Sequence, residues 1–288
     1  MNAIPIKPRK VTFDVSTVPR HWNGGGSVRA RFFDVLSVHF PEGEWFFIQS
    51  GRHEDRIKEP GLREDIRHFT RQEGLHGIVH DRINEKMVRL DIYVDQVTGN
   101  LRRFIRSSQK HLPEKYQLAM TAAFEHFTAT LGEAMLEEYV DVFGEANPVM
   151  RALFLWYGVE GAEHKAVVYD VYQTAVGGGY LMRASALVDT MSVLHLVAGP
   201  VFANMLRLDV AMRQPGSVLR GLNRIYGRTG ILTRMLPEFL DGFRSGVHPW
   251  DTGKPEKVAA WLEEYGDHGK PLRASVAVYG TAPMSEVA

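Results

Sequence analysis

The chain contains no cysteine in its 288 residues, and its 34 basic and 34 acidic side chains leave no net charge. The absence of cysteine excludes disulfide frameworks, thiolate zinc sites, Cys-ligated iron–sulfur clusters and cysteine nucleophiles. The absence of a basic surplus argues against nucleic acid as a partner, because phosphate binding needs one. The chain does contain 12 histidines, so a metal site with nitrogen and oxygen ligands is the first hypothesis to consider.

Long apolar runs are also absent. The N-terminus, MNAIPIKPRK, has no apolar stretch, so no secretory signal is recognised and a cytoplasmic location is expected. The longest uncharged run covers residues 190–206, which is shorter than the about 20 residues of a membrane-spanning helix. A buried core helix is the favoured interpretation of this run, and a peripheral membrane contact is the alternative.

The pattern along the chain predicts an all-α fold, because helical spacing recurs and strand signals are sparse. Three parts are predicted: an irregular segment at 1–30, a metal-binding helical bundle at 31–245, and a tail with a short helix at 246–288. Residues 34–40 are compatible with a helix or a short strand, and Pro41 is compatible with the start of a helix. Residues 95–100 contain a turn signal. Longer helices are predicted at the following ranges: 61–86, 113–142, 148–176, 182–213 with a bend at Gly199-Pro200, and one or two within 215–246.

One of these helices carries a potential metal-binding motif. Glu73, His76 and His80 stand at positions i, i+3 and i+7, so all three share one face of the predicted helix. A Glu-x-x-His pair places a carboxylate and an imidazole one turn apart, where both can reach one cation or two adjacent cations.

Three further stretches place acidic or histidine side chains on faces that otherwise look buried. Glu44 lies among aromatic residues in FPEGEWFF, and Glu125 has mainly small neighbours on its face. Glu160, Glu163 and His164 lie within about a turn of one another. Each motif alone is weak, and the alternative is that these groups face solvent or pair with arginines such as Arg71 or Arg82.

The coincidence of four such stretches is the stronger signal. A buried carboxylate without a partner costs several kcal/mol, so helices that bring four of them together need cations. One Glu from each of two helices and a Glu-x-x-His from each of the other two form the ligand set of carboxylate-bridged dimetal bundles. Two divalent metal ions are therefore predicted, with iron favoured and manganese or zinc as alternatives.

The same stretches resemble a known family. FPEGEWFF, RQEGLHGIVHDRIN, FEHFTA and LWYGVEGAEHKAVVYDVY are similar, in order and spacing, to the bacterial family of predicted metal-dependent hydrolases, over about residues 35–240. The resemblance implies a fold of ferritin-like or related diiron type with additional C-terminal helices. Residue by residue, it implies these ligands, with His80 and Glu163 in or beside the set: Glu44, Glu73, His76, Glu125, Glu160 and His164.

The last motif departs from the family pattern, Trp-His-x-x-Glu-Glu-x-Glu-His. Tyr157 stands at the position of its first histidine, and Gly161 at that of its second glutamate. Either the site is altered here, or Tyr157 takes a catalytic role as a ligand, a redox residue or a hydrogen-bond donor.

Three functions remain open, and the first of them is favoured over the other two. The first is a diiron oxygenase or oxidase, which would use O2 and an electron donor to oxidise an apolar or aromatic substrate. The second is a dimetal hydrolase, in which two Lewis acids activate a water molecule. The third is a helical protein that binds metal without catalysis. The apolar helix at 182–213 contains methionines and is compatible with a substrate tunnel as well as with core packing. A homodimer is compatible with the sequence.

Overall fold

The structure is a computed structural model that describes residues 4–89, 94–137, 139–253 and 255–279. Within these ranges the fold is all-α and contains no β-strand. The sequence prediction of fold class is thereby confirmed, whereas the likeness to ferritin stays a prediction. The helices in chain order are α1 (Ser27–Gly51), α2 (Pro60–Arg89), α3 (Val94–His111), α4 (Glu114–Glu137), α5 (Tyr139–Phe143), α6 (Pro148–His164), α7 (Val167–Val176), α8 (Tyr180–Leu208), α9 (Pro215–Tyr226), α10 (Ile231–Asp241), α11 (Pro255–His268) and α12 (Pro271–Tyr279).

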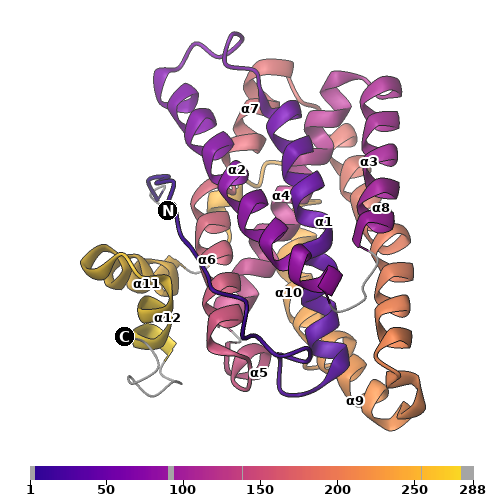
Figure 1. Cartoon of the computed structure of the whole chain (residues 1–288). Helices are drawn as coiled ribbons and strands as arrows, with labels where there is room; N and C mark the ends of the chain where they lie inside the picture. The colour runs from indigo at the N-terminus through magenta and orange to yellow at the C-terminus, as the bar shows by residue number, and fades with distance from the viewer. Residues whose placement is uncertain (1–3, 90–93, 138, 254, 280–288) are drawn as a thin grey trace.

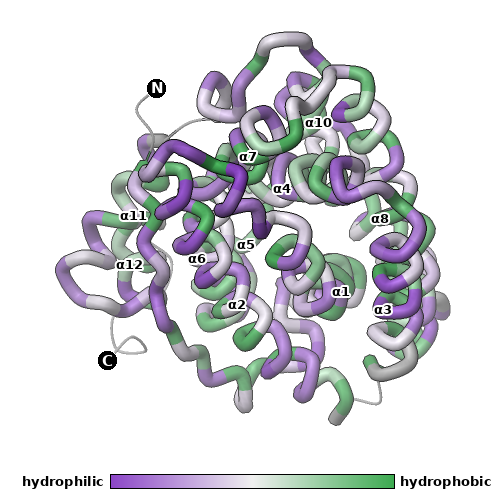
Figure 2. The backbone as a smooth tube through the Cα atoms, turned by 90° about the horizontal axis from the view of Figure 1, so that it is seen from above, coloured by the Kyte–Doolittle hydropathy of each residue, from purple (hydrophilic) through white to green (hydrophobic). Residues whose placement is uncertain are grey.

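Helices α1, α2, α4 and α6 form the centre of the bundle (Figure 1). On one side, α3 packs on α1 and α8 packs on both α1 and α4. On the opposite side, α11 and α12 form a hairpin against α6, as the view along the bundle makes clear (Figure 2). The four central helices are those that carry the predicted metal ligands.

Helix α1 runs through Pro41 instead of beginning there, so the predicted helix start is wrong. Proline has no N–H to donate to the carbonyl four residues earlier, which belongs to Ser37. The side chain of Asn84 on α2 donates to that carbonyl at 3.3 Å and replaces the missing partner. This tertiary hydrogen bond lets α1 continue to Glu44.

The predicted turn within 95–100 is also wrong, because Gly99 and Asn100 lie inside α3. Val94, Leu101 and Ile105 are buried on one face of α3. Burying three such side chains outweighs the cost of about 1 kcal/mol for a glycine in a helix.

The predicted helix at 148–176 is two helices, α6 and α7, with the break at Lys165 and Ala166. Lys165 donates to a carboxylate oxygen of Glu133 at 2.8 Å and to the carbonyl of Thr252 at 2.7 Å. The predicted end at 177–179 is confirmed, since Gly177 caps α7 with φ 58°. Left-handed backbone of this kind favours glycine.

The segments outside the bundle are more ordered than predicted. In the predicted irregular part, Val11, Phe13 and Trp22 are buried against the bundle. The C-terminal part contains a second helix, α12, whose Ser275 accepts a hydrogen bond from the indole of Trp261 at 3.0 Å. The three-part division of the chain itself stays a prediction.

Helix α8 is long and apolar enough, by length and composition alone, to cross a membrane. Its inner face packs on α1 and α4, but only 17% of its most apolar window is buried, and most of residues 190–206 are exposed or only partly buried. The prediction of a buried core helix at 190–206 is therefore wrong. The outer face of α8 exposes large apolar side chains, among them Leu181 and Leu196.

Candidate metal centre

Five of the predicted ligands meet in the interior of the bundle, each delivered by a central helix. They are Glu44 from α1, Glu73 and His76 from α2, Glu125 from α4 and His164 from the last turn of α6, and none is more than 2% exposed.

Two glycines bring α4 and α6 close enough for this meeting. A Cβ atom on Gly132 of α4 would lie 2.8 Å from the Cα atom of Gly158 on α6, which is closer than packed atoms approach. The start of α6 is fixed by Asn147, whose side-chain oxygen accepts from the backbone N–H of Val149 at 3.0 Å, with Pro148 at the first helical position. Such an N-cap stabilises a helix by about 1 kcal/mol.

The five side chains form two ligand groups that share Glu73. One group is Glu44, Glu73 and His76, and the other is Glu73, Glu125 and His164; in each, the ligand atoms lie within 4.8 Å of one another. One oxygen of Glu73 lies 3.3 Å from Nδ1 of His76 and 3.4 Å from Nε2 of His164. A carboxylate in this position can bridge two cations.

The centre contains polar atoms that lack partners of their own. Among the described residues, both carboxylate oxygens of Glu44 and Oε2 of Glu73 have no hydrogen-bond partner. Burial and the neighbouring Glu73 raise the pKa of Glu44 well above its ordinary value, and the same two causes raise the pKa of Glu125. Buried carboxylates of this kind need protons or cations, and oxygen with imidazole ligands suits iron, manganese or zinc. The residues present therefore fit a pair of divalent metal ions.

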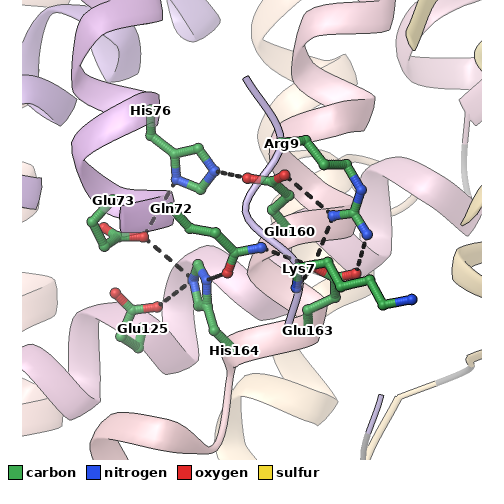
Figure 3. A network of polar contacts seen from close by, with 9 residues as sticks. All are labelled: Lys7, Arg9, Gln72, Glu73, His76, Glu125, Glu160, Glu163 and His164. Carbon is green, nitrogen blue, oxygen red and sulfur yellow. Dashed lines mark hydrogen bonds and ion pairs between the residues drawn. The ribbon is translucent and has the colours of Figure 1, made fainter. Parts of the chain in front are cut away.

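A second layer of polar residues orients the two imidazoles (Figure 3). Nε2 of His76 donates to Glu160 at 3.0 Å. Nδ1 of His164 donates to the side-chain oxygen of Gln72 at 2.9 Å, and the Gln72 amide in turn donates to Glu163 at 2.8 Å. These contacts fix both tautomers, so that each histidine presents its other nitrogen to the carboxylates.

Arg9 anchors this second layer from the N-terminal segment. It donates to Glu160 at 3.2 Å and to the two oxygens of Glu163 at 2.6 and 2.9 Å, all within the interior. Burial works against the charge of Arg9, but Glu163 and Glu160 raise its pKa above the ordinary value. Glu160 and Glu163 therefore lie outside both ligand groups, and their predicted ligand roles stay predictions.

His80 and Tyr157, two further predicted site residues, lie beside the ligands. Nδ1 of His80 lies 2.9 Å from the hydroxyl of Ser37, and its ring meets the Tyr157 ring edge-on. Tyr157 stacks on Phe40 with ring centroids 4.7 Å apart, at the same centroid distance from His76. Burial raises the pKa of Tyr157 well above its ordinary value, and Glu44 adds to the effect, so the phenol keeps its proton.

Gly161 lies on the same stripe of α6 as Tyr157 and His164, because these positions are separated by four and three residues. A Cβ atom at Gly161 would meet no heavy atom within 4 Å among the described residues. The departure from the family pattern thus leaves open space on the ligand-bearing face of α6.

Two apolar cavities lie beside the centre. The inner cavity has a volume of about 80 Å³. Its walls include Phe40, Gly43 and Phe47 on α1 and Phe124 on α4, which lie close in the chain to the ligands Glu44 and Glu125. The outer cavity, of about 380 Å³, lies between α8 and α10. The two share the following wall residues: Leu36, Phe127 and Leu194. The two cavities are therefore neighbours, and Phe40 in the wall of the inner one stacks on Tyr157.

Sequence patterns contain little sign of the role of Gln72 and none of the role of Arg9. Gln72 stands beside Glu73 in the chain, and any helix contains polar residues at such positions. Arg9 reaches Glu160 from 151 residues away in the chain, a distance over which spacing carries no information.

Residues 7–253 match the model of the family described as predicted metal-dependent hydrolase. No curated protein and no solved structure matches the chain. Because the match covers most of its length, the chain belongs to this family.

Proposed function

We propose that the chain is a hydrolase with two metal ions that acts on an ester-type bond of an apolar substrate. The observation that carries the proposal is the pair of ligand groups joined at Glu73, each completed by an oriented histidine. Family membership supports hydrolysis over oxidation. The family description thus favours what the sequence analysis had ranked second.

The ions, when bound, would supply Lewis acidity and a water molecule of lowered pKa. Glu44, Glu73, Glu125, His76 and His164 would hold them, since these residues make up both groups. Glu160 and Gln72 keep the imidazoles in place. Tyr157 retains its proton and is suited to donate a hydrogen bond to a substrate oxygen. The larger outer cavity, of about 380 Å³ and mainly apolar, would accept an apolar chain, and the aromatic walls of the inner cavity would keep water away from it.

Turnover of p-nitrophenyl esters of increasing acyl length tests this proposal, with metal-free protein reloaded with Mn(II) or Zn(II). We expect metal-dependent hydrolysis that favours longer chains. Glu73→Gln should lower turnover roughly 100-fold or more, because it removes the ligand common to both ions. Glu85→Gln, on the exposed side of α2, is the matched control and should leave turnover unchanged. Turnover that is independent of metal or equal in Glu73→Gln would refute the proposal.

Oxygen-dependent oxidation by a diiron form is the second candidate. One observation favours it: all five ligands are Glu or His on helices, and the aromatic rings of Phe40, Trp156 and Tyr157 lie around them. Carboxylate-rich helical centres of this type also occur in di-iron proteins. Anaerobic loading with Fe(II), followed by measurement of oxygen uptake and the visible spectrum, separates the two. Uptake without esterase activity favours oxidation, and tight metal binding with neither supports a non-catalytic role.

A further inference from the structure

The surface around the outer cavity combines exposed apolar side chains with arginines. Residues 207–234, from the end of α8 to the start of α10, contain six arginines and a single acidic residue, Asp209. Asp209 is buried and bound by Arg31 and Arg20 at 2.7 and 2.6 Å, so it offers no charge to the surface. Arg234 pairs with Asp141 at 3.1 Å, but the other five arginines are exposed, so the segment is a local concentration of positive charge in a chain without net charge.

Helix α9, at one corner of the bundle (Figure 1), shows how the two kinds of side chain are arranged. Its inner residue Ile225 is buried, whereas Leu219 is 67% and Tyr226 51% exposed. Leu219 and Tyr226 are seven residues apart and therefore share one edge of the exposed strip. Arg220 and Arg224 are exposed as well, and Arg220 lies about 100° further around the helix than Leu219. Apolar and basic edges thus lie side by side along α9.

The apolar edge of α9 continues to the mouth of the outer cavity. Tyr226 lines that cavity together with Leu236 of α10 and His195 of α8. Leu236 is itself 47% exposed, and Leu240 on the next turn of α10 is exposed too. Large exposed apolar side chains beside an opening into the interior cost solubility unless something covers them.

We propose that this face, defined as α9 with Leu236 and Leu240 of α10, docks on the surface of an anionic lipid membrane. Leu219, Tyr226 and Leu236 would enter the region between headgroups and acyl chains, and Arg220 and Arg224 would contact lipid phosphates. The charge decides the occupant: arginines beside leucines complement anionic lipid, since each basic side chain near such a surface adds attraction. A second copy of the chain would bring the same arginines against one another in a two-fold interface.

Docking in this orientation places the mouth of the outer cavity against the membrane. An apolar molecule could then pass from the acyl chains into the cavity without crossing water. The docking goes beyond the proposed hydrolase function and does not depend on it, because it concerns the surface and not the chemistry at the metals.

Co-sedimentation of the full chain with vesicles tests the proposal. We expect binding to vesicles of equimolar phosphatidylcholine and phosphatidylglycerol, weak binding to phosphatidylcholine alone, and loss of binding as salt concentration rises. Arg220→Glu with Arg224→Glu should lower the partition coefficient roughly tenfold or more, and Leu219→Glu should lower it too. Arg220→Lys with Arg224→Lys should keep the binding.

Two control variants lie away from this face. Arg67→Glu changes an exposed arginine of α2, and Ile78→Glu changes an exposed isoleucine of the same helix. Both should bind vesicles as the wild type does. Thermal melting and metal content establish that every variant is folded.

Three results would overturn the proposal. The first is no binding of the wild type to either vesicle, and the second is equal binding by the Arg220→Glu, Arg224→Glu variant. The third is a dimer in the absence of lipid that Leu219→Glu dissociates, which would make the face an interface between copies of the chain. Failure of the ester assay would leave each of these readouts intact.

Discussion

Glu125 illustrates how a single residue couples the metal centre to stability. Its carboxylate is 2% exposed, and burial together with Glu73 raises its pKa above the ordinary 4.5. Without metal, the side chain must keep a proton or depend on His164, whose Nε2 lies 3.1 Å from a Glu125 oxygen, as its one nearby cation among the ligands of its group. A metal ion replaces that proton, so metal binding and proton release are linked at this residue.

The first prediction is that Glu125→Gln changes stability in opposite directions with and without metal. Wild-type Glu125 contributes its full stability below pH 4.5 and loses it as the pH rises through the raised pKa. The uncharged glutamine avoids this loss, so the metal-free variant should be more stable than the wild type at neutral pH by about 1–3 kcal/mol. With metal bound, the variant should be the less stable protein, because it lacks a ligand. Urea unfolding across pH, with and without Mn(II), measures both.

The control for this experiment is Glu85→Gln on the exposed side of α2, which should behave as the wild type under all conditions. Metal-free Glu125→Gln that is less stable than the metal-free wild type at every pH would contradict the prediction. It would mean that ionisation of the Glu125 carboxylate does not destabilise the fold.

At this scale, the sequence could predict what depends on local spacing. Glu73 and His76 share a helix face by their separation of three residues, and the structure brings them together. The sequence could not predict which side chains each of these polar groups would bind. Glu160 lies on the right face, but it binds His76 and Arg9 instead of joining a ligand group, and only the folded position of Arg9 decides this.

At the scale of elements, helix α6 has two glycines with opposite environments. Gly158 touches α4 so closely that a Cβ atom would lie 3.1 Å from the Cα atom of Gly132. Gly161, one turn later, faces open space on the stripe of Tyr157 and His164. One glycine therefore serves packing, and the other leaves the centre with three carboxylates in its two ligand groups.

The second prediction is that Gly161→Glu adds a carboxylate to the centre. Three carboxylates face the four positive charges of two divalent ions, and a fourth would balance them. We expect the metal-loaded variant to release metal to a chelator at least roughly tenfold more slowly than the wild type. A tenfold change corresponds to about 1.4 kcal/mol in the free energy of activation for release. The metal-free variant should be less stable, because another buried carboxyl joins the group. Elemental analysis during chelator treatment gives the rates.

Two alanine variants separate packing from ligation. Gly161→Ala should stabilise α6 by about 0.5–1 kcal/mol, since alanine is the better helix former and has room. Gly158→Ala should destabilise the protein by about 1–3 kcal/mol, since α4 stands in the way. If Gly161→Glu released metal as fast as Gly161→Ala, its side chain would not reach the ions.

Helices whose buried faces follow a simple period were predictable from sequence, as α2 (predicted at 61–86, observed at Pro60–Arg89) demonstrates. The errors occurred where a tertiary contact overrides a local signal. Pro41 is tolerated because Asn84 supplies a hydrogen bond, and α6 ends where Lys165 reaches Glu133. Neither partner is close in sequence.

At the scale of the whole molecule, the segment around Arg9 and helix α11, which are far apart in the chain, meet beside the metal-bearing helix α6. Arg9 from the N-terminal segment binds Glu160 and Glu163, and its guanidinium lies 5.6 Å from the ring centre of Tyr265 on α11. Glu163 holds Gln72, which holds His164. A continuous chain of contacts therefore leads from Tyr265 through Arg9, Glu163 and Gln72 to His164.

The third prediction is that Arg9→Met weakens both the fold and the metal centre, although Arg9 belongs to neither ligand group. Methionine fills much of the space but leaves two buried carboxylates without their cation, which costs about 3–5 kcal/mol. Those carboxylates would then take protons or turn toward the metals, and the hold on His76 and His164 would loosen. Arg29→Met, which removes a pair with the exposed Glu145, should cost at most about 1 kcal/mol. Thermal melting and metal titration compare the two variants. Unchanged metal affinity in Arg9→Met would mean that the ligands keep their geometry without the contacts of Arg9.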